Sequence, residues 1–345
     1  MRLCKLNKKM SIGVIGAGRI GKIHIENILR RIPEVSLKSV ADLKIDNDLK
    51  RWANKIGIPN LDNNPSDIIN DSEIDAIIIA SSTNSHSELI QKAANAQKSI
   101  FCEKPLDVDL TRIKETLKVV NQNETKLMIG FNRRFDRNFK RVNDIIASGQ
   151  IGEPQIIKIT SRDPSPPSID YIKVSGGLFL DMTIHDWDMA RFQCRSEVEE
   201  VYATGAALVD PDIEKVGDID TAVSVLKFSN GALGVIDNTR QAVYGYDQRV
   251  EVFGSKGCLI ADNEATNTVS IYNAECTTID KIPSFFMERY LDSYYAELKY
   301  FFECIAKNKD PKPNGDECLK NVLVALAAKK SLEVNKPIKI SEVNS

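Results

Sequence analysis

The sequence has 345 residues, of which 42% are hydrophobic and 27% are charged, a composition typical of a folded globular protein with about two domains. Lys and Arg number 46 against 48 Asp and Glu, which gives a net charge of -2. This balance provides no positive field that would attract nucleic acid or an anionic membrane, so neither is expected as a partner.

Cysteine and histidine usage narrows the class of protein further. The seven cysteines are scattered, their number is odd, and no two form a C-x-x-C pair. This usage disfavours a disulfide framework or a zinc site and predicts a reducing, cytoplasmic location. With three histidines in the chain, no metal is expected. No apolar stretch approaches the roughly 20 residues that cross a bilayer, and no signal peptide is recognised.

The first third of the chain alternates strand-like and helix-like segments. Residues 76–82, AIIIASS, form a continuous apolar run, which is typical of a strand buried on both faces of a parallel sheet. Further strands are expected at 11–17, 36–43, 99–106 and 126–134, with helices between them. The repeated β-α-β pattern predicts an α/β Rossmann domain over residues 11–134.

The pattern changes after residue 151, where strands begin to dominate. Two hairpins are expected, one turning at Asn230-Gly231 and one at the Gly-Ser-Lys-Gly sequence of residues 254–257. Residues 135–345 are therefore predicted to form an α+β domain with a large open, mainly antiparallel sheet. Two late helices, at 288–306 and 318–333, are expected to pack back across the molecule.

The glycine-rich segment VIGAGRIG follows the first predicted strand and opens the first predicted helix. Its glycines, Gly16, Gly18 and Gly21, have the G-x-G-x-x-G spacing, which alone describes either a dinucleotide site or a simple strand-to-helix corner. The strand-turn-helix context favours the dinucleotide site, with the diphosphate bound at the helix N-terminus. Arg19 and Ile20, which lie between the last two glycines, are included in this predicted site.

Asp42 follows the second predicted strand, 21 positions after Gly21. A carboxylate there accepts hydrogen bonds from the adenosine ribose and repels a 2′-phosphate, which predicts NAD rather than NADP as the cofactor. The alternative is that Asp42 caps the following helix. After the strand at 76–82, four side chains lie where a Rossmann crevice opens: Ser81, Thr83, Asn84 and His86. His86 has the alternative role of capping the next helix.

Three downstream segments carry a family resemblance: FCEKPLDVD at 101–109, GFNRRFD at 130–136 and SGGLFLDMTIHDWDMARF at 175–192. With an E-K-P tripeptide and a D-x-x-x-H pair at this separation, the chain resembles the Gfo/Idh/MocA oxidoreductases over nearly all of its length beyond the first ten residues. The resemblance implies an N-terminal Rossmann domain, a C-terminal open-sheet domain, homotetramers formed through that sheet, and an NAD-dependent dehydrogenase.

The same resemblance implies three catalytic residues, Lys104, Asp181 and His185. If Asp181 and His185 lie on one helix, the i, i+4 spacing puts them on one face, where the carboxylate can orient the imidazole. Histidine titrates near neutral pH and suits the removal of a hydroxyl proton during alcohol oxidation. Lys104 would hold the reacting oxygen and stabilise its developing negative charge.

The substrate site is expected to be rich in side chains that donate and accept hydrogen bonds, since a cyclic polyol is uncharged and has a hydroxyl on every carbon. Glu103 is expected at the nicotinamide ribose, together with Lys104. The predicted substrate residues are Lys104, Arg133, Asp163, Asp181, Thr183, His185, Asp188 and Tyr246. By base rate each of the added residues is more often a surface or packing residue, and only the resemblance favours Asp163, Asp188 and Tyr246.

The resulting expectation is a dehydrogenase that oxidises myo-inositol to its 2-keto form with NAD. Three alternatives stay open at this point. The substrate is another polyol or sugar, such as scyllo-inositol or an aldose; the chain is an NAD-dependent glycosidase of the same fold; or it is a sensor that binds NAD without catalysis. The third is disfavoured because both the lysine and the histidine are present.

Overall fold

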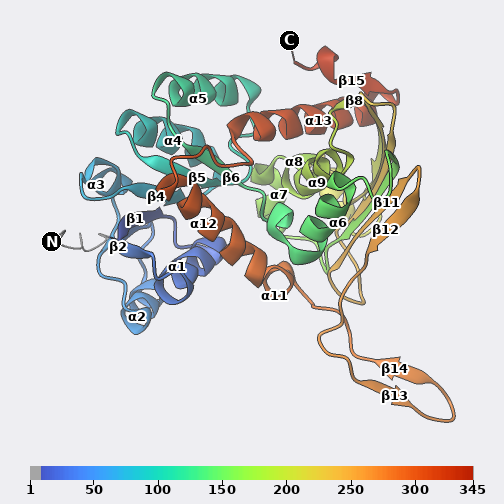
Figure 1. Ribbon diagram of the computed structural model, residues 1–345, viewed down its shortest axis with the longest axis horizontal. Helices are drawn as coiled ribbons and strands as arrows, with labels where there is room; N and C mark the ends of the chain where they lie inside the picture. Colours follow the sequence, from blue (N-terminus) through green and yellow to red (C-terminus); the bar gives the residue numbers. More distant parts are fainter. Residues whose placement is uncertain (1–8, 345) are drawn as a thin grey trace. The chain divides into compact units, whose positions relative to one another are not determined.

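The computed structural model describes residues 9–344 (Figure 1), and the chain divides into two compact units. The first unit contains the chain up to Phe131 together with Tyr294–Leu319, and the second contains Asn132–Ser293 together with the residues from Lys320 onward. The predicted division at residue 134 thus lies three residues beyond the observed one. The segment 294–319, which lies in the range predicted for the second domain but includes one of the late helices expected to pack back on the Rossmann domain, belongs to the first unit.

The first unit is built on a six-stranded sheet of order β3-β2-β1-β4-β5-β6 in which every neighbouring pair is parallel. Its strands are β1 (Met10–Ile15), β2 (Val35–Ala41), β3 (Leu61–Asp62), β4 (Ala76–Ile79), β5 (Ser99–Glu103) and β6 (Leu127–Gly130). This order is that of a doubly wound Rossmann fold, so the predicted class is confirmed. The central strand β4 is fully buried along its length, as its continuous apolar sequence predicts.

Helices cover both faces of this sheet, with α1 and α2 on one face and α4 and α5 on the other (Figure 1). The helices of the first unit are α1 (Arg19–Arg31), α2 (Asn47–Ile56), α3 (Pro65–Asn70), α4 (His86–Asn95), α5 (Leu110–Gln122) and most of α12 (Leu291–Ala306). Their starts follow local capping chemistry: the Asp46 side chain accepts from the Leu49 N–H at α2, and Asp109 does the same for Arg112 at α5.

The second unit contains a seven-stranded sheet of order β12-β11-β7-β10-β9-β8-β15. Only β7 and β10 run parallel, so the sheet is mainly antiparallel, as predicted. Its strands are β7 (Pro154–Arg162), β8 (Val198–Ala206), β9 (Thr221–Phe228), β10 (Leu233–Thr239), β11 (Asp247–Gly254), β12 (Gly257–Ala261) and β15 (Ile338–Lys339). Both predicted hairpins, β9–β10 and β11–β12, are present.

The remaining elements of this unit are mostly short helices. They are α6 (Arg137–Ala147), α7 (Ile169–Ser175), α8 (Leu178–Asp181), α9 (Ile184–Cys194), α10 (Pro211–Lys215), α11 (Phe286–Arg289) and most of α13 (Gly315–Val334). A small hairpin of β13 (Ser270–Tyr272) and β14 (Thr277–Ile279) projects from the unit (Figure 1). Helix α9 packs on β7 and is buried nearly all round, with Trp187 fully inaccessible.

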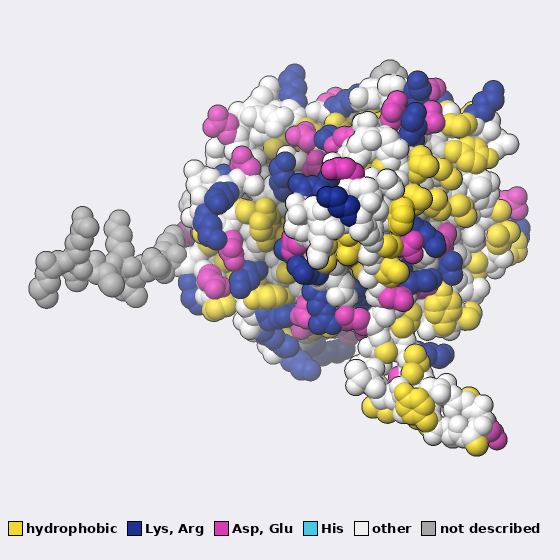
Figure 2. Space-filling view, turned by 45° about the vertical axis from the view of Figure 1, so that its right-hand side comes forward, with side chains coloured by type: hydrophobic (Ala, Val, Ile, Leu, Met, Phe, Trp, Pro, Cys, Tyr) yellow, Lys and Arg dark blue, Asp and Glu magenta, His cyan; other side chains and the backbone are white. Residues whose placement is uncertain are grey.

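The two faces of the large sheet differ in character. One face is buried, whereas the other exposes a set of apolar side chains that share one face by strand register: Ile156, Val223, Val225, Leu233, Phe253 and Ile260. Figure 2 shows hydrophobic side chains scattered over this side of the molecule and along the projecting hairpin. Scattered apolar residues are ordinary on protein surfaces, but Ile156, Leu233 and Phe253 are direct cross-strand neighbours on this one sheet face.

No disulfide joins the six cysteines of residues 9–344, and Cys4 lies outside the described residues. A cytoplasmic location stays a prediction. Within the same residues, none of the helices is both long enough and apolar enough to cross a bilayer.

Candidate active site

The glycine-rich turn between β1 and α1 packs tightly against the end of β4. Gly16 has a φ of +98°, and a Cβ there would come within 2.5 Å of the Ala80 carbonyl group. A Cβ on Gly21 would lie 2.0 Å from the Gly16 carbonyl oxygen. Larger residues at either position would force the helix away from the sheet, so both glycines are structural requirements of this turn.

The N-terminus of α1 is open to a ligand. Its N-cap residue, Gly18, provides no side-chain hydrogen bond to the first-turn N–H groups, and a Cβ there would meet no atom within 4 Å. Arg19 is exposed and Ile20 is partly buried on the first turn. A helix N-terminus with uncapped N–H groups and space in front of it fits a diphosphate.

A cavity of about 560 Å³ borders this turn at the carboxyl edge of the parallel sheet. It brings together four of the predicted cofactor residues, Gly16, Gly18, Asp42 and Ser81. Sequence reasoning missed several others that line it, among them Leu43, Lys44, Pro65, Ser66, Ser82, Ser85 and Leu89. The signal that could have found them is position, because they follow β2, β3 or β4 at the edge where the strand order reverses.

Asp42 is anchored to the glycine-rich turn. Its Oδ2 accepts from the Ala17 N–H at 2.7 Å, and its Oδ1 accepts from the Lys44 N–H at 2.9 Å. The alternative role as a helix cap is not observed, since α2 is capped by Asp46. The Asp42 carboxylate therefore lies between the turn and the cavity, where the sequence placed it.

The segment after β4 divides into residues that line the cavity and residues that do not. Thr83 and Asn84 lie in a short 3₁₀ helix (Thr83–Ser85) and are not among the lining residues. His86 is buried, with Nδ1 2.8 Å from the Pro105 carbonyl oxygen and Nε2 3.0 Å from the Ser81 carbonyl oxygen. Burial lowers the pKa of its imidazole. Both ring nitrogens face backbone carbonyls, so the ring neither caps α4 nor points at the cavity.

Lys104 directly follows β5 and is half-buried at the same carboxyl edge. Glu103, the last residue of β5, has its Oε1 2.6 Å from Nε2 of His24 on α1. Glu103 was expected at the nicotinamide ribose, and one oxygen of its carboxylate therefore already contacts a side chain of the protein.

In the second unit, Asp181 and His185 do not lie on one continuous helix, and that prediction is wrong. Asp181 ends α8, His185 is the second residue of α9, and the chain breaks helical continuity at Met182 and Thr183. Both side chains are half-buried. The Asp181 carboxylate is held by other groups: the Tyr171 hydroxyl donates to it at 2.9 Å, and the Arg240 guanidinium lies 3.4 Å away.

Asp163 joins this group of charges. It follows β7, and its N–H donates to the Thr239 carbonyl at 2.9 Å, one residue before Arg240. Withdrawal from water raises the pKa of the Asp163 carboxyl to about 6; the nearby Arg240 opposes this rise and the Asp181 charge adds to it. A carboxyl that titrates this close to neutrality is a feature of functional sites.

Arg133 and Tyr246 also come together, but mainly with internal partners. The Arg133 guanidinium lies 2.5 Å from the Asp186 carboxylate and 3.3 Å from the Tyr246 hydroxyl, and all three residues are buried. Burial raises the pKa of Asp186, whereas Arg133 and the Asn238 amide, which donates at 2.8 Å, favour its charged form. The arrangement is a buried ion pair with satisfied hydrogen bonds.

Two further predicted substrate residues have their polar atoms engaged inside the protein. The Thr183 hydroxyl, fully buried, bonds to the Leu178 carbonyl and to Asn238. Asp188 receives two hydrogen bonds from Arg134, at 2.8 and 2.6 Å, and one from Asn321. Sequence reasoning missed Tyr171, Arg240 and Asn238 altogether. No local sequence pattern marks Arg240, which meets Asp181 across 59 positions.

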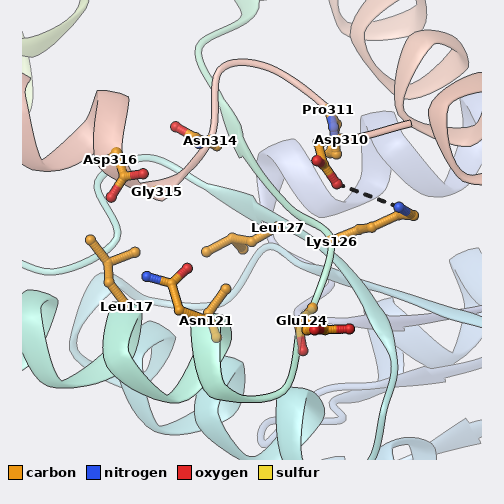
Figure 3. Close-up of a pocket in the computed structure, with 12 residues that line it drawn as sticks. Leu117, Asn121, Glu124, Lys126, Leu127, Asp310, Pro311, Asn314, Gly315 and Asp316 are labelled. Carbon is orange, nitrogen blue, oxygen red and sulfur yellow. Dashed lines mark hydrogen bonds and ion pairs between the residues drawn. The ribbon is translucent and has the colours of Figure 1, made fainter. Parts of the chain in front are cut away.

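A second cavity in the first unit, of about 280 Å³, lies at the opposite edge of the parallel sheet, where β6 begins (Figure 3). It lies between the end of α5 and the loop before α13, and the Lys126 ammonium meets the Asp310 carboxylate at its rim, 3.5 Å away. Ligands of open α/β sheets bind at the carboxyl ends of the strands, so this cavity is not the cofactor site.

A doubly wound sheet with a glycine turn, an uncapped helix N-terminus and an acid after β2 defines the class of nucleotide-dependent oxidoreductases. Comparison with known proteins identifies the family. Residues 10–131 match the model of an oxidoreductase family with an NAD-binding Rossmann fold, and residues 139–260 match the GFO/IDH/MocA C-terminal domain. The chain belongs to the Gfo/Idh/MocA family and is an NAD-dependent dehydrogenase, which confirms the resemblance seen in its sequence.

Individual relatives agree with this assignment over almost their whole length. The chain is 49% identical to a myo-inositol 2-dehydrogenase of Thermotoga maritima over 97% of this chain and 99% of the relative. It is 42% identical to an inositol 2-dehydrogenase of Rhizobium meliloti over 95% and 98%. Among solved structures, a scyllo-inositol dehydrogenase of Lactobacillus casei with bound NAD(H) and scyllo-inositol matches with a TM-score of 0.90 and 30% identity, covering 97% of this chain and all of that one.

Proposed function

We propose that this protein oxidises the carbon-2 hydroxyl of myo-inositol to a ketone, with NAD as the oxidant. The observation that carries the proposal is the full-length similarity to a myo-inositol 2-dehydrogenase at 49% identity, in a chain that has Lys104, Asp181 and His185. Scyllo-inositol is the second candidate, because the structure of a scyllo-inositol dehydrogenase superposes with a TM-score of 0.90.

In this proposal the carboxyl edge of the first unit holds the cofactor. The first-turn N–H groups of α1 donate hydrogen bonds to the diphosphate. Asp42, which lines the 560 Å³ cavity, accepts hydrogen bonds from the ribose hydroxyls. The Asp42 carboxylate already accepts hydrogen bonds from two backbone N–H groups, which fixes its position. Its negative charge opposes a 2′-phosphate. NAD, when bound, supplies the acceptor for the hydride that leaves the substrate carbon.

The acid–base and electrostatic roles fall to Lys104, Asp181, His185 and Asp163. His185 takes the proton of the hydroxyl group, so that the O–H bond breaks as the carbonyl forms. Asp181 stabilises the imidazolium electrostatically, and Tyr171 and Arg240 hold its carboxylate. The Lys104 ammonium stabilises the negative charge that develops on the oxygen. Asp163, with a pKa near 6, supports the substrate hydroxyls as a donor or an acceptor.

Product analysis tests this proposal. The purified protein, given NAD and one polyol at a time (myo-inositol, scyllo-inositol or glucose), should produce NADH fastest with myo-inositol, and chromatography should show the inosose. Faster NADH formation with scyllo-inositol would select the second candidate. Sugar release from a glycoside without net NADH would instead select the glycosidase alternative.

We further propose that the chain assembles as a homotetramer through the exposed face of its large sheet. The supporting observation is the apolar set on that face, of which Ile260 is 66% exposed and Phe253 is 46% exposed. A patch of this kind is energetically unfavourable in water and is typical of an interface.

A further inference from the structure

Two buried histidines contact the residues on either side of Lys104. His24, on α1, is fully buried and reaches the Glu103 carboxylate, with 2.6 Å between Nε2 and Oε1. His86, on α4, is 1% exposed and reaches the Pro105 carbonyl oxygen, with 2.8 Å to Nδ1. The tripeptide that presents Lys104 is thus held from both directions by side chains from different helices.

His86 also ties this tripeptide to the neighbouring strand. Its second nitrogen, Nε2, lies 3.0 Å from the carbonyl oxygen of Ser81, just beyond β4. β4 and β5 are adjacent parallel strands, so the ring bridges the two chain segments that leave the carboxyl edge side by side. A neutral imidazole has one N–H and bonds strongly to one of the two carbonyls at a time.

His24 is fixed in orientation by aromatic rings of the same unit. Its ring packs edge-on against Phe101, with 5.2 Å between centroids, and against Tyr294, with 5.8 Å. His24 lies one helical turn after Gly21, and its contact with Glu103 joins the start of α1 to the end of β5. A displacement of α1 would therefore be transmitted to Glu103 and its neighbour.

Glu297 of α12 completes the cluster around His24. Its side chain is fully buried, neither carboxylate oxygen has a hydrogen-bond partner, and its oxygen lies within 4.8 Å of the His24 nitrogen and the Glu103 oxygen. Burial and the negative charge of Glu103 raise the pKa of Glu297 well above its usual value. Glu297 therefore completes the buried cluster around His24 as a group whose charged form is disfavoured beside Glu103.

We propose that His24 and His86 are positioning residues, which hold Glu103 and Pro105 so that the intervening Lys104 is fixed at the cofactor edge, with the buried Glu297 completing the His24 side. Neither histidine touches reacting atoms. The proposal rests on the proposed role of Lys104 in catalysis. A misplacement of about 1 Å in a catalytic group costs on the order of 10²-fold in rate, so loosening either contact should lower kcat.

The test compares variants that keep a hydrogen-bond donor in place of the histidine ring nitrogen with variants that remove this donor. His24→Gln keeps a nitrogen at the Nε2 position and His86→Asn keeps one at Nδ1, whereas His24→Leu and His86→Leu keep neither. The leucine variants should lose roughly 10- to 100-fold in kcat, with KM for NAD changed less than about threefold. The His24→Gln and His86→Asn variants should have a kcat within about fivefold of that of the parent protein.

Lys98→Met is the matched control for lost buried hydrogen bonds. Lys98 is 8% exposed, precedes the opposite end of β5, and donates to the Asp71 and Ile74 carbonyl oxygens. This variant should lower Tm and leave kcat unchanged. If leucine prevents folding, His24→Asn and His86→Gln, which move the donor by one bond, provide the same comparison with the retained-donor variants.

The inference is overturned if the donor-free or displaced-donor variants keep the parent kcat, if Gln and Asn restore nothing, or if Lys98→Met loses as much activity. Stoichiometric metal in the purified full chain, measured by elemental analysis, would also overturn it, because an ion bound by His24, Glu103 and Glu297 would then hold Glu103 in place. Lys104→Ala separates the two proposals. Full activity of that variant defeats the proposed function itself, whereas its inactivity beside active histidine variants defeats only the positioning role.

Discussion

Lys104 and His185 come from different units of the chain, and each is half-buried at the end of a secondary-structure element. Replacing either by alanine removes an ammonium or an imidazole. We expect Lys104→Ala and His185→Ala to bind NADH with nearly the parent affinity and to lose about 10²- to 10³-fold in kcat. NADH fluorescence titration and initial rates measure the two effects separately.

The control for this pair is Lys126→Ala. Lys126 lies at the opposite edge of the parallel sheet, where its ammonium pairs with Asp310 at the rim of the smaller cavity. Its removal should leave both NADH affinity and turnover intact. Retention of most activity by the Lys104 or the His185 variant would show that the site is assigned to the wrong residues.

Asp163 provides a pH test. Its folded-state pKa of about 6 lies above the usual aspartate value of 3.8, so the folded protein holds this proton more tightly than the unfolded chain does. The stabilisation is fully present below pH 4 and is lost as pH rises through 6. We expect Asp163→Asn to become more stable relative to the parent protein between pH 4 and pH 8.

The size of this change follows from the same shift. One pKa unit corresponds to about 1.4 kcal/mol, and a half-buried carboxyl keeps part of its hydration, so a change of about 1–2 kcal/mol is expected. Urea unfolding at several pH values measures it. A pH-independent difference between the two proteins would mean that the Asp163 carboxyl titrates normally.

Several site residues could be predicted from the sequence because each stands in a short, directional motif. The glycines and Asp42 carry their own spacing, and their geometry depends on local backbone contacts such as the Asp42 bond to the Ala17 N–H. Partners of buried charges are different, because no local pattern encodes them. Arg133 meets Asp186 and Tyr246 across 53 and 113 positions, and Arg240 meets Asp181 across 59.

At the scale of elements, the break between α8 and α9 could not be predicted from the sequence. The i, i+4 spacing of Asp181 and His185 fits one helix, yet α8 ends at Asp181 and α9 restarts at Ile184. Helical periodicity alone does not reveal such a break, since both short helices bury apolar residues on each side of it. Tertiary contacts decide it: the Thr183 hydroxyl bonds to the Leu178 carbonyl and to Asn238.

The β1–α1 turn offers a contrast between two glycines. Gly21→Ala places a methyl group 2.0 Å from the Gly16 carbonyl oxygen, so we expect a loss of about 1–3 kcal/mol in stability and weaker NADH binding. Gly18→Ala meets no protein atom but lies at the cavity, so NADH binding should weaken while Tm stays near the parent value. Thermal unfolding measures the Tm of both variants, and NADH titration measures their affinity for the cofactor. Equal effects on Tm would contradict this description of the turn.

At the scale of the whole molecule, the sequence predicted both fold types and late helices that pack back, but not which residues of those helices join the first unit. Strand and helix periodicity are local, so the parallel and antiparallel sheets followed directly from them. The assignment of Tyr294–Leu319 to the first unit depends on which surface α12 covers, a tertiary property. His24 packing against Tyr294 is one of the contacts that fix it, and it joins residues 270 positions apart.

The exposed sheet face predicts the assembly state. Light scattering should give four times the 38.5 kDa mass of one chain. Val223→Lys combined with Val225→Lys, on the exposed face of β9, should shift the protein toward smaller species, because charges buried in an interface are strongly unfavourable. A parent protein that is monomeric at micromolar concentration would contradict the proposed tetramer.

Isotope transfer tests the central claim most directly. The protein is incubated with NAD and myo-inositol that carries deuterium at carbon 2, and the reduced cofactor is analysed by mass spectrometry. We predict one deuterium in the NADH and an inosose of equal amount, with both products formed about 10²- to 10³-fold more slowly by the His185→Ala variant. Reduced cofactor without deuterium, or no reduced cofactor with this substrate, would contradict oxidation of myo-inositol at carbon 2.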